Sequence, residues 1–259
     1  MIPNLNPVGL IIDCANPGRV RDFYAALLGL EKTVAYGRPA FKVETGFTVL
    51  FAETEVPYIP PVWPEVPGAQ QKQMHLDFVV DDLPSAVEDA NRLGAAKPAE
   101  QYGDHYVTLL DPDGHPFCLC ARSNEKSSFD MYYETKGWGP IPDLSIMVDC
   151  QKSKNIRDFY ARLKNWDRDF HGSVLIPANK MIICFQESEG DYDYVPPVWP
   201  EASGAQQKQM QFIIKTDDLR SAVDEAARFG AVIADAQYDG EYFVTMIDTE
   251  GHPFCLCDK

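Results

Sequence analysis

The sequence predicts an α+β fold made of four strand–helix–strand modules, arranged as two tandem repeats whose curved mixed sheets form cups. One observation is duplication, because three segments return in the same order about 136 residues later. These segments are residues 60–65, 68–74 and 114–120, which recur at 196–201, 204–210 and 251–257. The other observation is hydrophobic patterning, since a short apolar strand, an amphipathic helix and further strands occur twice in each repeat.

The length of 259 residues allows two domains of ordinary size, each with a core of its own. The duplication places the first domain at residues 1–122 and the second at residues 141–259. Residues 123–140 between them begin as a polar stretch without apolar periodicity, which is typical of a linker. Hydrophobic residues make up 45% and charged residues 24% of the chain, which is the composition of a soluble globular protein.

The formal net charge of −16 argues against nucleic acid as a partner, because phosphate binding needs clustered Lys and Arg side chains. The N-terminus lacks a basic segment followed by an apolar run, and no apolar stretch reaches the ~20 residues of a membrane span. Seven cysteines, four of them in Cys-x-Cys pairs, fit reduced thiols better than disulfides. We therefore expect a cytoplasmic protein without a membrane partner.

The first module begins with an apolar, β-branched run at residues 8–14, which predicts a strand. A helix follows, because Asn16 is a good N-cap, Pro17 suits the first helical position and Gly29 is a natural end. Residues 32–52 predict two or three strands separated by glycine-containing turns. A proline-rich excursion then occupies residues 57–67.

The second module has the same order of elements. Residues 75–80 predict a strand, and Asp82 starts a helix that ends near Gly94. Residues 106–110 form the next strand, and a tight turn leads to the final strand at residues 116–120. The second repeat follows the same pattern, and we expect one cup between the first and fifth strands of each half.

Several fragments, taken in this order, resemble the glyoxalase/bleomycin-resistance/dioxygenase family, also called the vicinal oxygen chelate superfamily. In the first repeat they are residues 22–29 (Asp-Phe-Tyr-Ala-Ala-Leu-Leu-Gly), 75–83 (His-Leu-Asp-Phe-Val-Val-Asp-Asp-Leu) and 111–117 (Asp-Pro-Asp-Gly-His-Pro-Phe). Residues 158–160, 211–219 and 248–254 repeat the pattern. The resemblance covers nearly all of the chain and implies tandem glyoxalase-like domains.

The resemblance also implies where a metal would bind. Metal-dependent members take ligands from a His or Gln on the first strand, a His on the fifth strand and a Glu on the last. In this sequence the six positions fall on Gly9, His75 and Cys118 in the first half, and on Ser145, Gln211 and Cys255 in the second. Only His75 is the usual imidazole and neither half has the carboxylate, so we expect no divalent metal or other cofactor at these positions. The alternative is a divalent metal site in which a substitute such as Glu53 or Glu187 supplies the missing carboxylate.

His75 and Cys118 are the candidate catalytic residues, because the resemblance makes the fifth and last strands neighbours. With Cys120 they could bind a soft metal such as zinc, or the Cys118 thiolate could be a nucleophile. His75 alone could be a general base, since imidazoles titrate near neutrality. The alternative is that the cysteines only pack, because Cys255 and Cys257 persist in the second half where Gln211 replaces the histidine.

Trp63 and Trp199 are candidate ligand-binding residues, because the prolines around each of them hold the indole at low entropic cost. They could close the cup over a flat or cationic ligand, or they could form a contact between domains or chains. Gln211, Phe51 and Tyr24 are the other residues that we expect to contact a ligand.

These observations predict a tandem glyoxalase-like protein that sequesters or senses a small organic molecule without the usual metal. One alternative is a lyase, isomerase or dioxygenase that uses His75 in the first domain only. Another is an interaction protein that binds a partner through the two Trp-Pro loops. The expected partner is a small-molecule ligand, and the chain is expected to be a monomer with pseudo-dimeric halves or a homodimer.

Overall fold

A computed structural model of the chain describes residues 8–43, 47–122, 144–168, 173–176, 181–187, 193–237 and 242–258. The predicted linker, residues 123–140, lies outside these residues. The described elements follow the strand–helix–strands order four times, so the predicted α+β class and its four modules are confirmed. In the second module the first strand after the helix is reduced to a single bridge between Ala96 and Leu110.

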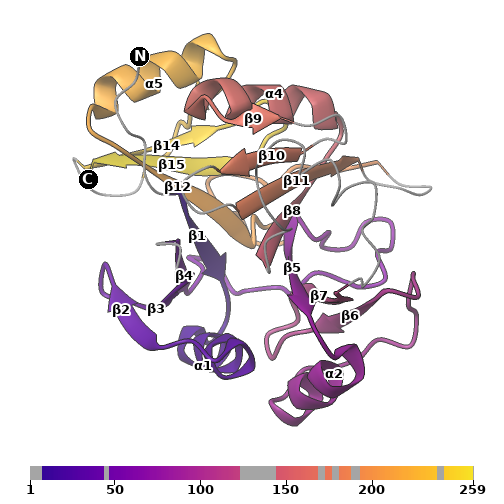
Figure 1. Cartoon of the computed structure of the whole chain (residues 1–259). Coiled ribbons are helices and arrows are strands. Elements are labelled where there is room, and N and C mark those ends of the chain that lie inside the picture. Colours follow the sequence, from indigo (N-terminus) through magenta and orange to yellow (C-terminus); the bar gives the residue numbers. More distant parts are fainter. Residues whose placement is uncertain are drawn as a thin grey trace.

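The strands form two mixed sheets (Figure 1). In the eight-stranded sheet the order is β13 (Val232–Ile233), β14 (Phe243–Ile247), β15 (Pro253–Asp258), β12 (Met210–Thr216), β1 (Val8–Asp13), β4 (Thr48–Ala52), β3 (Arg38–Lys42) and β2 (Lys32–Ala35). In the seven-stranded sheet the order is β6 (Tyr106–Leu110), β7 (Pro116–Ala121), β5 (Met74–Val80), β8 (Leu144–Cys150), β11 (Met181–Glu187), β10 (Ser173–Ile176) and β9 (Asp167–Arg168).

Four helices accompany the sheets within the described residues. They are α1 (Pro17–Leu28), α2 (Leu83–Arg92), α4 (Ser153–Lys164) and α5 (Leu219–Arg228). The Asn16 side chain accepts a hydrogen bond from the backbone of Arg19 at the start of α1, and Gly29 ends that helix with φ of 66°. None of the helices in the described ranges is long and apolar enough to cross a membrane.

Each sheet contains strands from both repeats. Strand β1 of the first repeat pairs antiparallel with β12 of the second, and β5 of the first pairs antiparallel with β8 of the second. In Figure 1 the first repeat lies in the lower part and the second in the upper part, and the two strand pairs join them. The expectation of a cup between the first and fifth strands of one half was therefore wrong. The first strand of each half pairs with the fifth strand of the other.

The two sheets share one hydrophobic core on their helix-facing sides. In β5 the alternate residues that enter it are Met74, Leu76 and Phe78. The ring of Tyr24 in α1 lies 5.7 Å from that of Phe117 in β7 and 6.2 Å from that of Phe51 in β4. Since β4 and β7 belong to different sheets, α1 packs between them. The opposite faces of the strands carry residues such as His75 and Asp77, and we call these faces the cup sides of the sheets.

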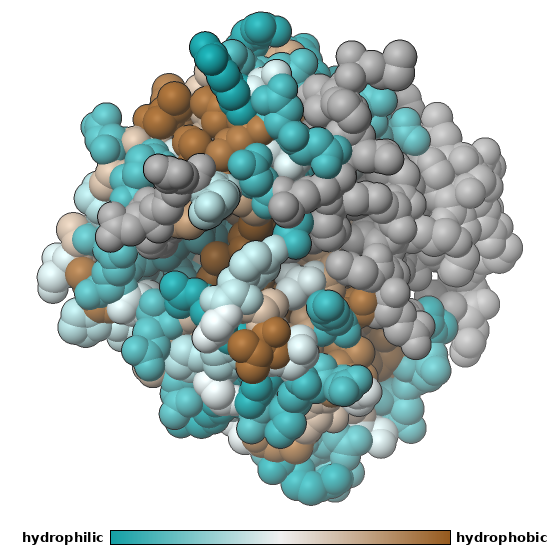
Figure 2. Space-filling model, turned by 90° about the vertical axis from the view of Figure 1, so that its left-hand side faces the viewer, coloured by the Kyte–Doolittle hydropathy of each residue, from teal (hydrophilic) through white to brown (hydrophobic). Residues whose placement is uncertain are grey.

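Much of the surface that Figure 2 draws in colour is hydrophilic. Figure 2 shows one side of the molecule, on which hydrophilic residues surround separate hydrophobic patches. Exposed apolar side chains such as Val34 (67%) and Val232 (59%) lie on β2 and β13, the two edge strands of the eight-stranded sheet. Single exposed hydrophobic residues are normal on protein surfaces, so we assign these no role.

Glutamines join the repeats through reciprocal hydrogen bonds. The backbone N–H of Gln71 donates to Oε1 of Gln206 (2.8 Å), and the backbone N–H of Gln207 donates to Oε1 of Gln70 (2.9 Å). The Gln71 and Gln207 side chains then bind the backbone of the opposite proline-rich segment, with partners Asp193, Val195, Pro57 and Ile59. The duplicated Gly-Ala-Gln-Gln-Lys-Gln sequence thus forms a pseudo-symmetric polar contact between the halves.

A buried lysine lies beside each of these glutamine pairs. Lys72 Nζ lies 2.5 Å from Asp149 Oδ2 in the other repeat and 3.2 Å from Glu65 Oε1, and it lies 5.3 Å from the centre of the Trp63 ring. Burial alone would lower the pKa of Lys72, but the carboxylates of Asp149 and Glu65 outweigh it and raise that pKa. The lysine therefore stays charged inside the protein.

The second repeat has the same arrangement. Lys208 is paired with Asp13 of the first repeat and lies 2.6 Å from Glu201 Oε1, and it is 5.4 Å from the centre of the Trp199 ring. Both tryptophans therefore lie over cations that connect the two repeats. The contacts of Trp63 with Lys72 and of Trp199 with Lys208 therefore connect the duplicated Trp-Pro segments to the pairing of strands between the two repeats.

We predict that Lys72→Met lowers the free energy of unfolding by about 3–5 kcal/mol, because it leaves the Asp149 and Glu65 carboxylates buried without a cation. Urea denaturation followed by circular dichroism measures this change. Lys154→Met is the control, since Lys154 is exposed on α4 and its loss should change stability by at most about 0.5 kcal/mol. Equal effects of the two substitutions would contradict the proposed importance of the buried pair.

His115 holds the turn between β6 and β7 through two acceptors. Its Nδ1 lies 2.8 Å from Asp111 Oδ2, and its Nε2 lies 2.7 Å from the backbone oxygen of Asp13. Both ring nitrogens donate to these oxygens only when the imidazole is protonated. Burial opposes the charge, but the Asp111 carboxylate outweighs it and raises the pKa of His115. In the second repeat the matching distance from His252 Nδ1 to Asp248 Oδ2 is 3.5 Å.

We predict that His115→Gln destabilises the protein in a pH-dependent way. Because the folded-state pKa is raised, the contribution of the His115 proton is fully present below about pH 6.5 and is lost as the pH rises through the folded value. Urea denaturation of both proteins between pH 6 and pH 9 should therefore show a stability difference that shrinks with increasing pH. His252→Gln, measured in the same way, serves as the comparison because His252 occupies the matching turn of the second repeat. A stability difference between wild type and His115→Gln that stays constant across this range would disprove the assignment.

Candidate functional site

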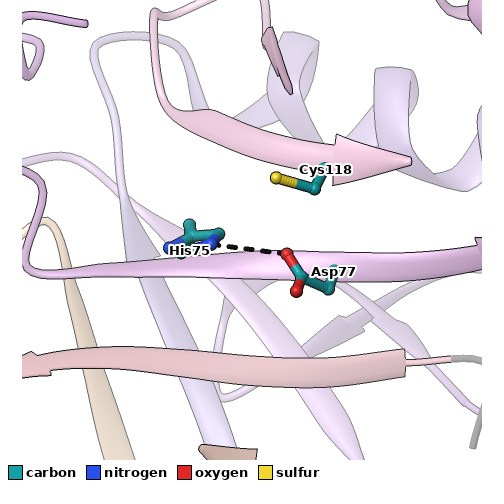
Figure 3. A group of neighbouring side chains, drawn as sticks. All are labelled: His75, Asp77 and Cys118. Atoms are coloured by element: carbon teal, nitrogen blue, oxygen red, sulfur yellow. Dashed lines mark ion pairs between the residues drawn. The ribbon is translucent and has the colours of Figure 1, made fainter. Parts of the chain in front are cut away.

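Three side chains meet on the cup side of the seven-stranded sheet. His75 and Asp77 are two residues apart on β5 and therefore point to the same side of it. Strand β7 is the parallel neighbour of β5, and its register places Cys118 beside Asp77. The nitrogen, oxygen and sulfur atoms that these residues offer lie within 4.8 Å of one another (Figure 3). The predicted proximity of His75 and Cys118 is thus confirmed, and Asp77 joins them.

Polar atoms of this cluster are buried and incompletely bonded. His75 is 7% exposed, and its Nδ1 has no hydrogen-bond partner within the described residues. Its Nε2 lies 3.4 Å from Asp77 Oδ1, which makes no hydrogen bond with the described residues either. A buried polar atom without a partner costs about 1–3 kcal/mol, so such atoms mark places where a ligand, a water molecule or an ion is held.

The thiol of Cys118 is protonated at neutral pH in this environment. Burial, reinforced by the Asp77 carboxylate, raises its pKa far above the ordinary value, against a smaller opposite effect of the Thr108 hydroxyl. The Thr108 oxygen lies 3.5 Å from Cys118 Sγ. Burial also raises the pKa of Cys120, to about 12. A nucleophilic thiolate therefore needs a cation beside it, and the role of Cys118 as a nucleophile stays a prediction.

The eight-stranded sheet has a different set at the matching positions. Gln211 takes the place of His75, and its Nε2 lies 4.0 Å from Cys255 Sγ. Cys255 also contacts the Thr245 hydroxyl at 3.7 Å. Ile213 takes the place of Asp77, so this cup has neither an imidazole nor a carboxylate beside the cysteine. The chemistry of the two cups therefore differs although their backbones correspond.

The first-strand positions complete neither cup. Gly9 pairs with Ile213, so it lies in the same cup as Gln211 and not in that of His75. A Cβ at Gly9 would lie 3.1 Å from the backbone oxygen of Thr48, which leaves little room for a longer ligand residue. Ser145 pairs with Asp77 in the other cup. Within the described residues, no His–His–Glu set of the kind that the family resemblance implies is formed.

The other predicted ligand-binding residues have separate locations. Trp63 and Trp199 lie over the buried lysines between the repeats, and Trp199 Nε1 donates a hydrogen bond to the backbone oxygen of Ala236. Tyr24 and Phe51 are fully buried in the core on the helix side of the eight-stranded sheet. We expected these two rings to contact a ligand in the cup, but they lie on the opposite side of the sheet, inside the core. They pack against each other because strand alternation turns Phe51 away from the cup side.

Asp77 is the member of the cluster that sequence reasoning missed. The signal was available, because residues two apart on a strand share a face and the spacing His75-x-Asp77 fits a strand. Its position beside Cys118 depends on the register between β5 and β7, which no sequence motif gives.

Comparison with known proteins agrees with this architecture. A sequence model of the glyoxalase-like domain matches residues 9–120 and again residues 145–257. A point mutant of glyoxalase I from Zea mays superposes with a TM-score of 0.61 at 15% identity, over 96% of this chain and 92% of that chain. Unmutated glyoxalase I from Zea mays gives a TM-score of 0.57 at 15% identity, over 96% and 91%.

A proposed dioxygenase from Bacillus subtilis gives a TM-score of 0.51 at 14% identity, over 99% of this chain and 85% of that chain. No curated protein matches the sequence significantly. At these identities the structural similarities show the fold alone. The two regions matched by the family model take up most of the sequence. This protein therefore belongs to the glyoxalase-like domain family, within the vicinal oxygen chelate superfamily, and carries the domain twice.

Proposed function

We propose that this protein binds a small organic molecule in the cup of the seven-stranded sheet, next to His75, and thereby sequesters or senses it. The observation that carries the proposal is the His75 side chain, which is nearly buried on the cup side and has an unpaired Nδ1. Binding sites place a few polar groups of this kind in an otherwise apolar wall. Neighbouring cup-side residues include Cys120 and Met147, which offer apolar surface beside the polar cluster.

The proposal does not include the hard divalent metal that typical members of the superfamily use. Gln211 and Cys255 offer no charged oxygen to such an ion, and the Gly9 position has no side chain. In the other cup Cys118 replaces the carboxylate of the last strand, and hard ions prefer oxygen ligands to sulfur. The glyoxalase-like fold can thus serve ligand binding here without that ion.

An enzymatic role is the first alternative, and the contact between His75 and Asp77 favours it. A carboxylate 3.4 Å from an imidazole nitrogen can orient the ring, as it does for general bases in many enzymes. In that case a lyase, isomerase or dioxygenase reaction would occur in this cup only, because Gln211 in the other cup cannot accept a proton at neutral pH.

An interaction protein is the second alternative. Val62 and Val198, next to the two tryptophans, are 41% and 43% exposed and could contact another chain. The tryptophans themselves are already in contact with Lys72 and Lys208, which favours a role inside the molecule.

The cysteines and the sheet topology bear on the setting in which the protein works. All seven cysteines lie within the described residues and none of them forms a disulfide there, which supports our proposal of a reducing compartment such as the cytoplasm. One chain supplies all strands of both described sheets, and we therefore propose that a monomer with pseudo-dimeric halves is sufficient for function.

We predict that His75→Gln weakens ligand binding by a factor of about 5 to 150, the range expected for losing a buried hydrogen bond, whereas Gln211→His leaves it unchanged. The measurement is a thermal-shift screen of a fixed library of small organic acids, aromatics and cations, repeated from pH 5 to pH 8 and followed by calorimetry of the hits. Hits that survive His75→Gln but disappear with Gln211→Ala would place the ligand in the other cup.

We also predict that Mg²⁺ does not raise the melting temperature of the purified protein. An ion that binds only the folded state stabilises it by mass action, so a saturating concentration would reveal any site. A thermal melt after chelator treatment, with and without added Mg²⁺, provides the measurement. A rise in melting temperature with Mg²⁺ that Asp77→Asn abolishes would show that a hard-ion site exists after all.

A further inference from the structure

We propose that the rim of the eight-stranded sheet binds a small aromatic anion, such as an aryl carboxylate, through the ammonium group of Lys215 and the ring of Tyr36. This rim belongs to the cup that has Gln211, so the site is separate from the ligand site beside His75 and does not depend on it. Neither Lys215 nor Tyr36 is a position at which the family resemblance implies a metal ligand.

The first observation is the direction of the Lys215 side chain. Phe212 and Ile214 of β12 enter the hydrophobic core, so Lys215 points to the cup side of the sheet, as Gln211 and Ile213 do. Its ammonium group lies against the Tyr36 ring and forms no ion pair with a carboxylate of the described residues. Since a lysine ammonium carries several N–H donors, Lys215 can donate to an anionic group at the rim.

Tyr36 reaches this lysine from a distant part of the same sheet. Tyr36 and Gly37 form the turn between β2 and β3, and the flanking residues Ala35 and Arg38 pair with each other. In the strand order, β1 and β4 lie between β12 and this hairpin (Figure 1). Nevertheless, Nζ of Lys215 lies 5.1 Å from the centre of the Tyr36 ring. The sheet therefore curves until the tip of the hairpin meets β12 across the cup.

The backbone of the turn makes Tyr36 an unusual choice of residue. The φ angles of Tyr36 and Gly37 are 53° and 71°, and two positive angles are typical of the tight turns that join paired strands. Such turns favour Asn, Asp or Gly at the position of Tyr36, and a bulky side chain is unfavourable there. The side chain is also 67% exposed, so packing in the core does not explain it. An exposed aromatic ring in an unfavourable conformation favours a role in binding.

Half-buried side chains beside Lys215 give the site an apolar floor. Cys257 of β15 pairs with Lys215, and Phe243 of β14 pairs with Cys257. Ile213 lies two residues before Lys215 on the same side of β12. Burial raises the pKa of the Cys257 thiol and the nearby Lys215 ammonium opposes this rise, so the thiol is neutral at physiological pH. A ligand ring can therefore contact apolar surface on one side and the exposed Tyr36 ring on the other.

The charges at the rim select an anion. Arg38, which directly follows the turn, is exposed and adds a second positive charge to the hairpin. The chain as a whole has a net charge of −16, so two cations at one rim distinguish this place from the average surface. A carboxylate that accepts a hydrogen bond from Lys215 forms a charge-assisted contact, which is stronger than a neutral one. Together with stacking on Tyr36, this contact defines an aromatic carboxylate as the ligand class.

The cup of the seven-stranded sheet supplies a matched comparison within the chain. There Val79 pairs with Cys120 in the register in which Lys215 pairs with Cys257. The same strand also carries the Asp77 carboxylate on the cup side. One cup therefore has a carboxylate and no lysine on its fifth strand, and the other has the reverse. The anion site forms once in the chain, so one equivalent of ligand should bind.

The test is calorimetric titration of the full-length protein with 2-naphthoate and with 2-naphthylmethylammonium, a cation of similar shape. We expect one equivalent of naphthoate to bind, and the cation to bind at least about tenfold more weakly because Lys215 repels it. Lys215→Val, which introduces the residue found at Val79, should weaken naphthoate binding at least about tenfold, and Lys215→Gln should do the same if the valine variant does not fold. Lys154→Val removes an exposed lysine of α4 as the control and should change the affinity by less than about twofold.

Tyr36→Asn separates binding from folding. Asparagine is favoured in this turn, so urea denaturation should show stability that is unchanged or higher than in the wild type. Loss of the ring should nevertheless weaken naphthoate binding by about threefold to tenfold. A tyrosine with a purely structural role would give the opposite pattern, with lower stability and unchanged affinity.

Two results would overturn the site: no binding of naphthoate at about 5 mM, or an affinity that stays unchanged when Lys215 is replaced. His75→Gln separates this inference from the proposed function and should leave naphthoate binding intact. Naphthoate binding that is lost with His75→Gln and persists in Lys215→Val would place the anion in the other cup, which contradicts this inference and supports the proposed function. Binding that depends on Lys215, in a protein without any ligand that depends on His75, would have the opposite meaning.

Discussion

The structure depends on the crosswise pairing of its two repeats, and two buried lysines stabilise that pairing. Lys72 and Lys208 each bind an aspartate of the other repeat, Asp149 and Asp13, and each also has a glutamate and a tryptophan beside it. Removing one charge from such a pair leaves the opposite charge buried without a partner, which strongly destabilises the folded state. The hydrogen-bonded glutamines extend the same contact along the duplicated segment. Together they fix β5 against β8 and β1 against β12.

That pairing decides which residues can act together. If each half had closed its own sheet, His75 and Gly9 would have been neighbours, and so would Gln211 and Ser145. In the structure Ser145 lies opposite Asp77, and Gly9 lies opposite Ile213. The cup with the imidazole therefore gains a hydroxyl at the first-strand position, and the cup with the amide gains a residue that has no side chain. The side chains that line the two cups therefore differ in another way than they would if each half had closed its own sheet.

The parts of the fold that follow local rules could be predicted from the sequence. The cap at Asn16, the end of α1 at Gly29 and the alternation in β5 depend on neighbouring residues only, and the structure agrees with them. Which strand pairs with which was not predictable, because the repeat makes both partners equally suitable in sequence. The same limit applies to Asp77, whose approach to Cys118 depends on the register of two strands far apart in the chain.

The two cups show how much chemistry can change on one backbone. The cysteine and the threonine beside it occur in both, and burial raises the pKa of Cys255, to about 11, as it raises that of Cys118. On one strand the differences fall at alternate positions, at which Gln211 replaces His75 and Ile213 replaces Asp77. Alternate positions share the cup side, so these exchanges change the site without touching the core on the other side. A duplicated domain can therefore specialise one cup while the second continues to complete the fold.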